Sequence, residues 1–239
     1  MPQPRTLYDK LIKSHTVCLL DEDGGELLLY VDRTVLNEYT SPQAFTGLRE
    51  SGRKVWRPEA MLGVVDHVNS TRPDRNTLFG NEQDVQCEYF ARNCSDFGIE
   101  LFDLFHRQQG IEHVVMPELG LVLPGQVIAA GDSHTTTYGA FGALGFGIGT
   151  SDIEHLLATQ TLVYRRLKNM LISLKGNLSP GITAKDVIMA IIRKIGASGA
   201  SGYAVEFQGA AIDKLSMEGR MTICNMAVEC GSRGAVIAP

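Results

Sequence analysis

Short apolar runs that alternate with longer amphipathic stretches constrain the fold of this chain more than any other feature of its sequence. MLGVV (61–65), EHVV (112–115), QVIAA (126–130) and MLISL (170–174) have the length and composition of buried strands. The stretches between them have helical spacing, and this alternation is typical of parallel strands joined by helices. We therefore predict an α/β fold with three α/β/α layers around a largely parallel sheet.

Two of the predicted helices carry signals at their ends. Ser151 opens S-D-I-E, a capping box with Glu154, and apolar residues then recur at helical spacing as far as Leu167. Thr183 opens T-A-K-D ahead of VIMAIIRKI, and Gly196 follows as a C-terminal cap. Both patterns predict helices.

The remaining segments predict loops and a last short helix. The polar segment 68–84 contains a proline and predicts a long loop before a helix over 85–97. RMTICNMAVECG (220–231) predicts a short helix that Gly231 closes. GASGASG (196–202) is interpreted as a loop inside one domain that spans 1–239, with a boundary between two α/β subdomains near 196–203 as the alternative.

Composition excludes several classes of protein. An apolar share of 44% with 21% charged residues indicates a globular chain, and no apolar run is long enough to span a bilayer. The first residues lack the apolar core of a secretory signal, so we expect a cytoplasmic protein. The five cysteines form no C-x-x-C and predict neither a disulfide framework nor a compact zinc site. The net charge of -5 argues against a nucleic-acid partner.

Two predicted strands run into the same kind of polar pair. MLGVV is followed by Asp66 and His67, and QVIAA by Gly131 and then Asp132 and His134. The carboxyl ends of parallel strands face the ligand crevice, and an Asp beside a His favours the protonated imidazole, a proton donor. In a single such pair, the Asp is more often a helix cap or turn residue and the His is hydrogen-bonded to the backbone. Two pairs at two strand ends instead indicate a functional site.

The glycine-rich run after His134 matches no phosphate-binding motif. The residues between its glycines are Ala, Phe, Leu and Ile, so close backbone packing explains them better than a nucleotide cradle. Backbone amides ahead of the helix at Ser151 remain available to a carboxylate. His155 there has the pattern of a metal ligand with Asp152 and Glu154, but a solvent-facing first turn is the better interpretation.

For other polar residues, the sequence does not decide between a role in a pocket and a structural or surface role. His113 lies among apolar residues, where a lone histidine is more often a core residue than a catalyst. Asn225 and Glu229 are four apart and share a helix face, which is either part of a pocket or solvated.

Several stretches together resemble the aconitase superfamily, and the resemblance covers essentially the whole chain. They are LYDKLIKSH (7–15), SPQAF (41–45), VVDH (64–67), GIEH (110–113), AAGDSHTTTYGAFGALGFGIGTSDIEH (129–155) and ICNMAVECG (223–231). Among its members, the chain is most similar to the N-terminal part of the large subunits that isomerise 2-isopropylmalate and 3-isopropylmalate in leucine biosynthesis, by removing and re-adding water.

The resemblance implies roles for nine residues. Asp66 and His67 protonate the departing hydroxyl, and Gln43 contacts substrate. Asp132, Ser133 and His134 bind substrate and the departing water, and His113, Asn225 and Glu229 complete the pocket. The residues expected to be catalytic are Asp66, His67, Asp132, His134 and Glu229, and those expected to bind substrate are Gln43, His113, Ser133 and Asn225.

The resemblance also implies a [4Fe-4S] cluster whose cysteine ligands lie beyond the matched region, so no metal ligand is expected in this chain. It implies a small subunit, the swivelling domain, that carries a serine base and forms a heterodimer with the large subunit. We therefore expect the N-terminal portion of an iron-sulfur hydro-lyase domain, incomplete at its C-terminal end and inactive alone.

Three alternatives stay open at this stage. The first is a related hydro-lyase that acts on homoaconitate, citraconate or 2-methylmalate. The second uses the Asp, His and Glu groups as ligands of a divalent metal, as in a hydrolase. The third is a non-catalytic remnant that binds a partner subunit.

Overall fold

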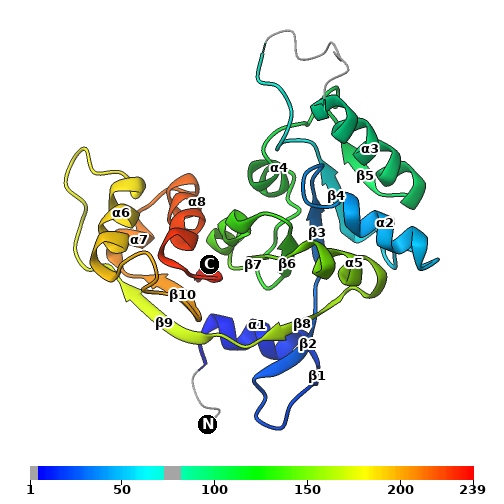
Figure 1. The fold of residues 1–239 in the computed structure, drawn as a ribbon. Coiled ribbons are helices and arrows are strands. Elements are labelled where there is room, and N and C mark those ends of the chain that lie inside the picture. Colours follow the sequence, from blue (N-terminus) through cyan, green and yellow to red (C-terminus); the bar gives the residue numbers. More distant parts are fainter. Residues whose placement is uncertain (1–4, 73–81) are drawn as a thin grey trace.

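The computed structural model describes residues 5–72 and 82–239, and a five-stranded parallel sheet lies at its centre (Figure 1). The sheet has the order β5-β4-β3-β6-β7. Its strands are β3 (Arg33–Leu36), β4 (Met61–Val64), β5 (Glu100–Phe102), β6 (Val127–Ala130) and β7 (Leu144–Gly147). The chain winds outward from β3 to β5 on one side and from β6 to β7 on the other. The direction of winding therefore reverses between β3 and β6.

Helices cover both faces of this sheet. On one face, α2 (Pro42–Glu50), α3 (Glu82–Phe97) and α5 (Thr150–Thr159) share a buried core with side chains of β3 and β4. The opposite face is covered by α4 (Glu112–Glu118) and by the 3-10 helix η2 (Ser133–Phe141). This arrangement confirms the predicted α/β/α layers (Figure 1).

Two three-stranded sheets flank the central one. An antiparallel sheet packs against α1 (Leu7–His15) and has the order β1 (Thr16–Leu19), β2 (Glu26–Tyr30) and β8 (Thr161–Arg165). A parallel sheet has the order β11 (Gly234–Ile237), β10 (Tyr203–Gln208) and β9 (Lys168–Ser173). Its core includes side chains of α6 (Ala184–Ile195), α7 (Ala210–Asp213) and α8 (Met217–Met226).

The helix η2 joins the central sheet to the second parallel sheet. Tyr138 of η2 belongs to the core of the central sheet, whereas Ala140, two residues later, belongs to the core around β10 and β11. η2 begins directly after Asp132, so the element that carries the Ser133-His134 pair is held from both sides.

Most of the predicted elements are confirmed. The strands predicted at 61–65, 126–130 and 170–174 are β4, β6 and β9. Thr183 caps α6 in a capping box with Asp186, and Gly196 ends that helix. The helix predicted over 85–97 is α3, and part of the loop predicted before it lies outside the described residues. The alternative boundary at 196–203 stays a prediction.

The strand predicted at 112–115 is wrong, because these residues begin α4. A run of four apolar-rich residues has too few positions to separate a strand from a buried helix. In the structure, Glu112, His113, Val115 and Met116 are buried. That spacing is one face of a helix that packs on the sheet, so tertiary packing decides the element.

The helix predicted from Ser151 to Leu167 is also wrong at both ends. It begins at Thr150, and the capping carboxylate belongs to Asp152, which accepts a hydrogen bond from the Gly149 N–H. It ends at Thr159 because Gln160 adopts a left-handed conformation. Residues 161–165 form β8, whose side chains are alternately buried and exposed. The apolar residues in this segment therefore repeat every two positions, as in a strand, although we had assigned them to the helix.

Two glycines of the glycine-rich run allow close backbone contacts. A Cβ on Gly145 of β7 would overlap the carbonyl oxygen of Thr135, and one on Gly139 would overlap that of Ala235. These contacts press η2 against β7 and β11, which confirms the packing interpretation of these two glycines.

Every helix in the described ranges is too short or too polar to cross a lipid bilayer.

We predict that Gly145→Ala lowers the free energy of unfolding by about 1–3 kcal/mol, because η2 must move away from β7 to admit the methyl group. Urea unfolding measures the change. The control is Gly25→Ala, since the nearest atom there is the end of the flexible Asp21 side chain. Equal stabilities of the two variants would contradict the packing role of Gly145.

Candidate active site

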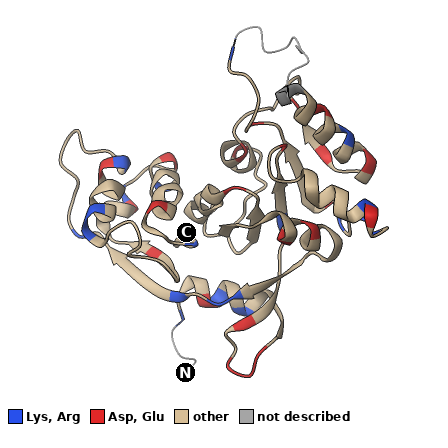
Figure 2. Ribbon diagram, in the orientation of Figure 1, with Lys and Arg blue, Asp and Glu red and all other residues tan. Residues whose placement is uncertain are grey.

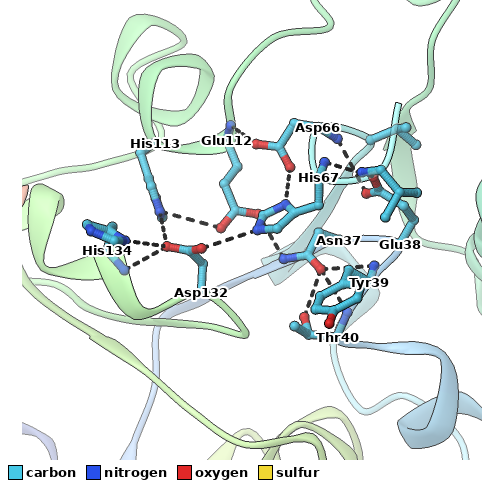
Figure 3. Close-up of polar contacts among 12 residues, drawn as sticks. Asn37, Glu38, Tyr39, Thr40, Asp66, His67, Glu112, His113, Asp132 and His134 are labelled. Atoms are coloured by element: carbon cyan, nitrogen blue, oxygen red, sulfur yellow. Dashed lines mark hydrogen bonds and ion pairs between the residues drawn. The ribbon is translucent and has the colours of Figure 1, made fainter. Parts of the chain in front are cut away.

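Three adjacent strands of the central sheet end in polar residues at the same edge (Figure 3). β3 is followed by Asn37 and Glu38, β4 by Asp66 and His67, and β6 by Asp132. In open α/β sheets, ligands bind where the winding direction reverses, and here that point lies between β3 and β6.

His67 lies between two carboxylates. Its Nδ1 is 2.5 Å from Asp66 Oδ1, and its Nε2 is 3.2 Å from Asp132 Oδ2. The hydrogen bonds to Asp132 and Asp66 raise the pKa of His67 to about 10, although burial acts in the opposite direction. At neutral pH His67 is therefore an imidazolium with a proton to donate.

Asp132 connects three elements of the site. Burial acts to raise the pKa of Asp132, but hydrogen bonds from His113 and His67 outweigh burial and hold that pKa well below its usual range. Its Oδ1 is 2.7 Å from His113 Nε2 and accepts from the His134 N–H at 2.6 Å. One ionised carboxylate thus orients α4, η2 and the His67 ring.

A second histidine pairs with an acid from the far end of the chain. His134 Nε2 is 3.2 Å from Oε1 of Glu229, which lies in the 3-10 helix η3 (Ala227–Cys230). Ser133 Oγ is 3.2 Å from His134 Nδ1. Asn225 of α8 donates to Thr137 Oγ1 at 2.9 Å, so α8 and η3 are fixed to η2 at the site.

These side chains surround one cavity of about 360 Å³. Its lining is Asp66, His67, Ile111, Glu112, His113, Asp132, His134 and Asn225. Ser133 and Glu229 do not line this cavity, but both contact the ring of His134, which does. Gln43 is the exception, because it lies exposed in the first turn of α2 and its side chain has no hydrogen bond with a described residue.

Glu38 is a site residue that sequence reasoning missed. Its side chain is fully buried, and its carboxylate accepts from the N–H groups of Asp66 at 3.3 Å, His67 at 2.7 Å and Val68 at 2.6 Å. It therefore fixes the turn that presents His67. The sequence signal was an acid two residues after the apolar pair Val35-Leu36, but we had not predicted the strand β3 that precedes it.

Glu112 was also missed, because we had placed it in a strand. It is fully buried, and its Oε2 accepts from Asn37 Nδ2 at 3.4 Å. Burial raises the pKa of Glu112 to about 7.

The cysteines do not fit an iron-sulfur cluster. Cys18 is exposed on β1, whereas Cys87, Cys94, Cys224 and Cys230 are buried in helices. Burial raises the pKa of Cys94 to about 12, which opposes the thiolate form that a metal needs. Across residues 5–72 and 82–239, the groups with metal-ligand spacing contain only carboxylates and imidazoles.

The comparison with known families agrees with this geometry. The family model for the aconitase family (aconitate hydratase) matches residues 9–239. The chain belongs to the aconitase family.

Members of the aconitase family include relatives of high identity. The chain is 65% identical over 236 residues to 3-isopropylmalate dehydratase large subunit 1 of Mannheimia succiniciproducens. It is 62% identical over 236 residues to 3-isopropylmalate dehydratase large subunit 2 of Salmonella choleraesuis and of Salmonella typhimurium. Each match covers 98% of this chain and 50% of the relative, so the chain spans about half the length of these relatives.

A solved structure shares the fold. Aconitase X of Thermococcus kodakaraensis, in its holo-form, superposes with a TM-score of 0.52 at 10% identity. The match covers 88% of this chain and 52% of that one.

We predict that Glu38→Gln lowers the free energy of unfolding by about 1–3 kcal/mol, because a carboxamide accepts fewer N–H groups and adds donors of its own. Chemical denaturation measures this loss, with the exposed Glu50→Gln as the control. If both variants unfold at the same denaturant concentration, Glu38 does not fix the turn at His67.

The raised pKa of His67 also predicts a pH dependence. A raised pKa contributes stability that is full below the ordinary value of 6.5 and is lost as the pH rises toward about 10. The wild-type chain should therefore lose stability over that interval more steeply than His67→Gln. Urea unfolding as a function of pH measures both slopes, and the exposed His155→Gln should retain the wild-type slope.

Proposed function

We propose that this chain supplies the proton-donor side of an active site that isomerises 2-isopropylmalate and 3-isopropylmalate by dehydration and rehydration. One observation carries the proposal: the His67 ring lies between the carboxylates of Asp66 and Asp132 at the wall of a cavity. The names of relatives at 62–65% identity support this substrate over homoaconitate, citraconate or 2-methylmalate.

Dehydration needs a donor because hydroxide is a poor leaving group. The contact from His67 Nε2 to Asp132 is longer than the one from Nδ1 to Asp66, so a substrate hydroxyl competes best at Nε2. His67 gives its Nε2 proton to the departing oxygen, which leaves as water, while a base outside this chain removes the proton of the neighbouring carbon and the C=C bond forms. Asp66 keeps the His67 ring in place. Rehydration reverses the transfer and returns the proton to His67.

The other site residues bind and orient in this proposal. Asp132, which His113 of α4 binds, holds the His67 ring. The His134–Glu229 pair, with Ser133 beside it, faces substrate and the departing water. Asn225 fixes α8 against η2, and Gln43 contacts substrate from the first turn of α2.

We propose that the complete enzyme also contains a [4Fe-4S] cluster and a small subunit. Since the thiols of these 239 residues do not fit a cluster, its ligands must come from other polypeptide, and this chain alone should be inactive. A cytoplasmic location stays part of the proposal.

A divalent-metal site is the second candidate, because Glu112, His113 and Asp132 place one donor atom each within 4.8 Å of one another. Metal analysis of the purified chain distinguishes the two. Near-stoichiometric zinc or manganese would favour the metal enzyme.

A chimera tests the proposed function. This chain replaces the first half of the Mannheimia succiniciproducens large subunit, which is co-expressed with its small subunit and reconstituted anaerobically with iron and sulfide. Turnover of 2-isopropylmalate supports the proposal. A folded, cluster-containing chimera that binds the small subunit without turnover would favour the non-catalytic remnant.

In the same chimera we predict that His67→Asn lowers kcat by about 10²–10⁴-fold, since the proton donor is lost. The control is His155→Asn on the exposed side of α5. Absorbance of the unsaturated intermediate reports both rates, and comparable kcat values for the two variants would remove His67 from the mechanism.

A further inference from the structure

Arg233 is a charged residue to which the proton-donor scheme gives no role. It lies in the turn between η3 and β11 and is exposed, whereas its neighbours Ser232 and Gly234 are buried. Its guanidinium has no hydrogen bond and no ion pair with the residues in 5–72 and 82–239. No contact within the described parts of the chain therefore has to break before Arg233 binds an anion.

The backbone of this turn is fixed on both sides of Arg233. Ser232 Oγ donates to the carbonyl oxygen of Gly234 at 2.7 Å, and the Ser232 N–H donates to that of Ala227 in η3 at 3.3 Å. Gly231, which precedes this serine, adopts a left-handed conformation with a φ of 85°. The turn therefore holds the base of the Arg233 side chain in place, and a ligand has to order only the side chain itself.

Arg233 lines a cavity of about 220 Å³, which we call the arginine cavity. It lies at the carboxyl ends of two strands of the central sheet, because Gly131 follows β6 and Gly147 ends β7. The other residues that line it are Ser133, Ile148, Val228 and Ser232.

Ser133 connects the arginine cavity to the candidate active site. Its Oγ is 3.2 Å from Nδ1 of His134, and His134 lines the cavity of about 360 Å³ that also contains His67. The two cavities are therefore neighbours on either side of the Ser133-His134 pair. A small molecule with polar groups at both ends can occupy both of them at once.

Two acids of the chain lie near Arg233 without binding it. Arg233 also lines a third cavity, of about 230 Å³, together with Glu26 of β2 and Asp152 of α5. Neither carboxylate forms an ion pair with Arg233, and Asp152 Oδ2 instead accepts the Gly149 N–H at 3.2 Å. A carboxylate that enters the arginine cavity thus has no bound protein carboxylate to displace.

The substrate of the proposed function needs a cation that the larger cavity does not provide. 2-Isopropylmalate carries two carboxylates at neutral pH, and the described residues that line the 360 Å³ cavity include Asp66, Glu112 and Asp132 but neither a lysine nor an arginine. Figure 2 shows acidic positions on α4, at the side of this cavity. A guanidinium matches a carboxylate with parallel N–H groups, so Arg233 is suited to the missing role.

We propose that Arg233 is a substrate-binding residue whose guanidinium binds one carboxylate of the hydroxy-acid beside the hydroxyl group of Ser133. The hydroxyl-bearing part of the substrate then occupies the cavity of His67 and His134. The identity of the hydroxy-acid rests on the proposed function. The carboxylate site does not, because it follows from the fixed turn, the unpaired guanidinium and the cavity that it lines.

The proposal predicts a change in KM for the active chimera. Arg233→Gln should raise the KM for 2-isopropylmalate by about 10- to 100-fold, as expected for the loss of a charge-assisted hydrogen bond, with little change in kcat. Arg233→Lys keeps the charge but not the fork of N–H groups, so its KM should lie between these values. The control is Arg165→Gln, an exposed arginine of β8 that lines the third cavity and not the arginine cavity, and its KM should equal that of wild type.

The first experiment uses the wild-type chain of 239 residues and needs no variant to fold. Phenylglyoxal modifies arginine side chains, and peptide mass spectrometry measures the rate at each one. 2-Isopropylmalate should slow the modification of Arg233, whereas its uncharged dimethyl ester should not, and Arg165 should react equally in both. A rate at Arg233 that 2-isopropylmalate leaves unchanged up to its solubility limit overturns the proposal.

The chimera separates this proposal from the proposed function. If the wild-type chimera turns over, a KM of Arg233→Gln equal to that of wild type overturns the role of Arg233 and leaves the proposed function standing. Loss of small-subunit binding by Arg233→Gln also overturns it, because Arg233 would then belong to the subunit interface. An inactive wild-type chimera counts against the proposed function, and the phenylglyoxal result still decides whether Arg233 binds a carboxylate.

Discussion

The Asp132 carboxylate is the interaction on which the rest of the site depends. It binds His67 after β4, His113 on α4 and the backbone of His134 at the start of η2. These groups come from three separate parts of the chain, and one acceptor holds them together because it is ionised and accepts from several donors at once. The parallel sheet makes this possible, since it brings the ends of β4 and β6 to opposite sides of β3 at the same edge.

Buried polar contacts beneath the site support this arrangement. Glu38, at the end of the strand between β4 and β6, satisfies the backbone of the turn that contains His67. On the other side, close contacts at Gly139 and Gly145 leave η2 little freedom to move. The histidines are therefore positioned by main-chain packing as well as by their own ion pairs, which is how a site keeps its geometry before a ligand arrives.

The carboxyl groups in and beneath the cavity differ in the groups that bind them. Asp66 and Asp132 are paired with imidazoles, and Glu38 is bound by backbone donors. Glu112 has only longer contacts, from Asn37 Nδ2 at 3.4 Å and His113 Nε2 at 3.7 Å, and burial raises its pKa. Carboxyl groups a few ångströms apart thus have different properties because their hydrogen-bond partners differ.

The sequence by itself determined the α/β class, the strands β4, β6 and β9, the caps of α6 and the Asp-His pairs at two strand ends. It could do so because these features are local: apolar runs, capping residues and polar residues directly after a strand are visible within a few positions. Only the tertiary structure decided that residues 112–118 are helical, that 161–165 form a strand, that Glu229 reaches His134, and that Glu38 and Glu112 belong to the site. Their conformation and surroundings depend on contacts between segments far apart in the chain, and a short stretch of sequence carries no information about which distant groups will surround it.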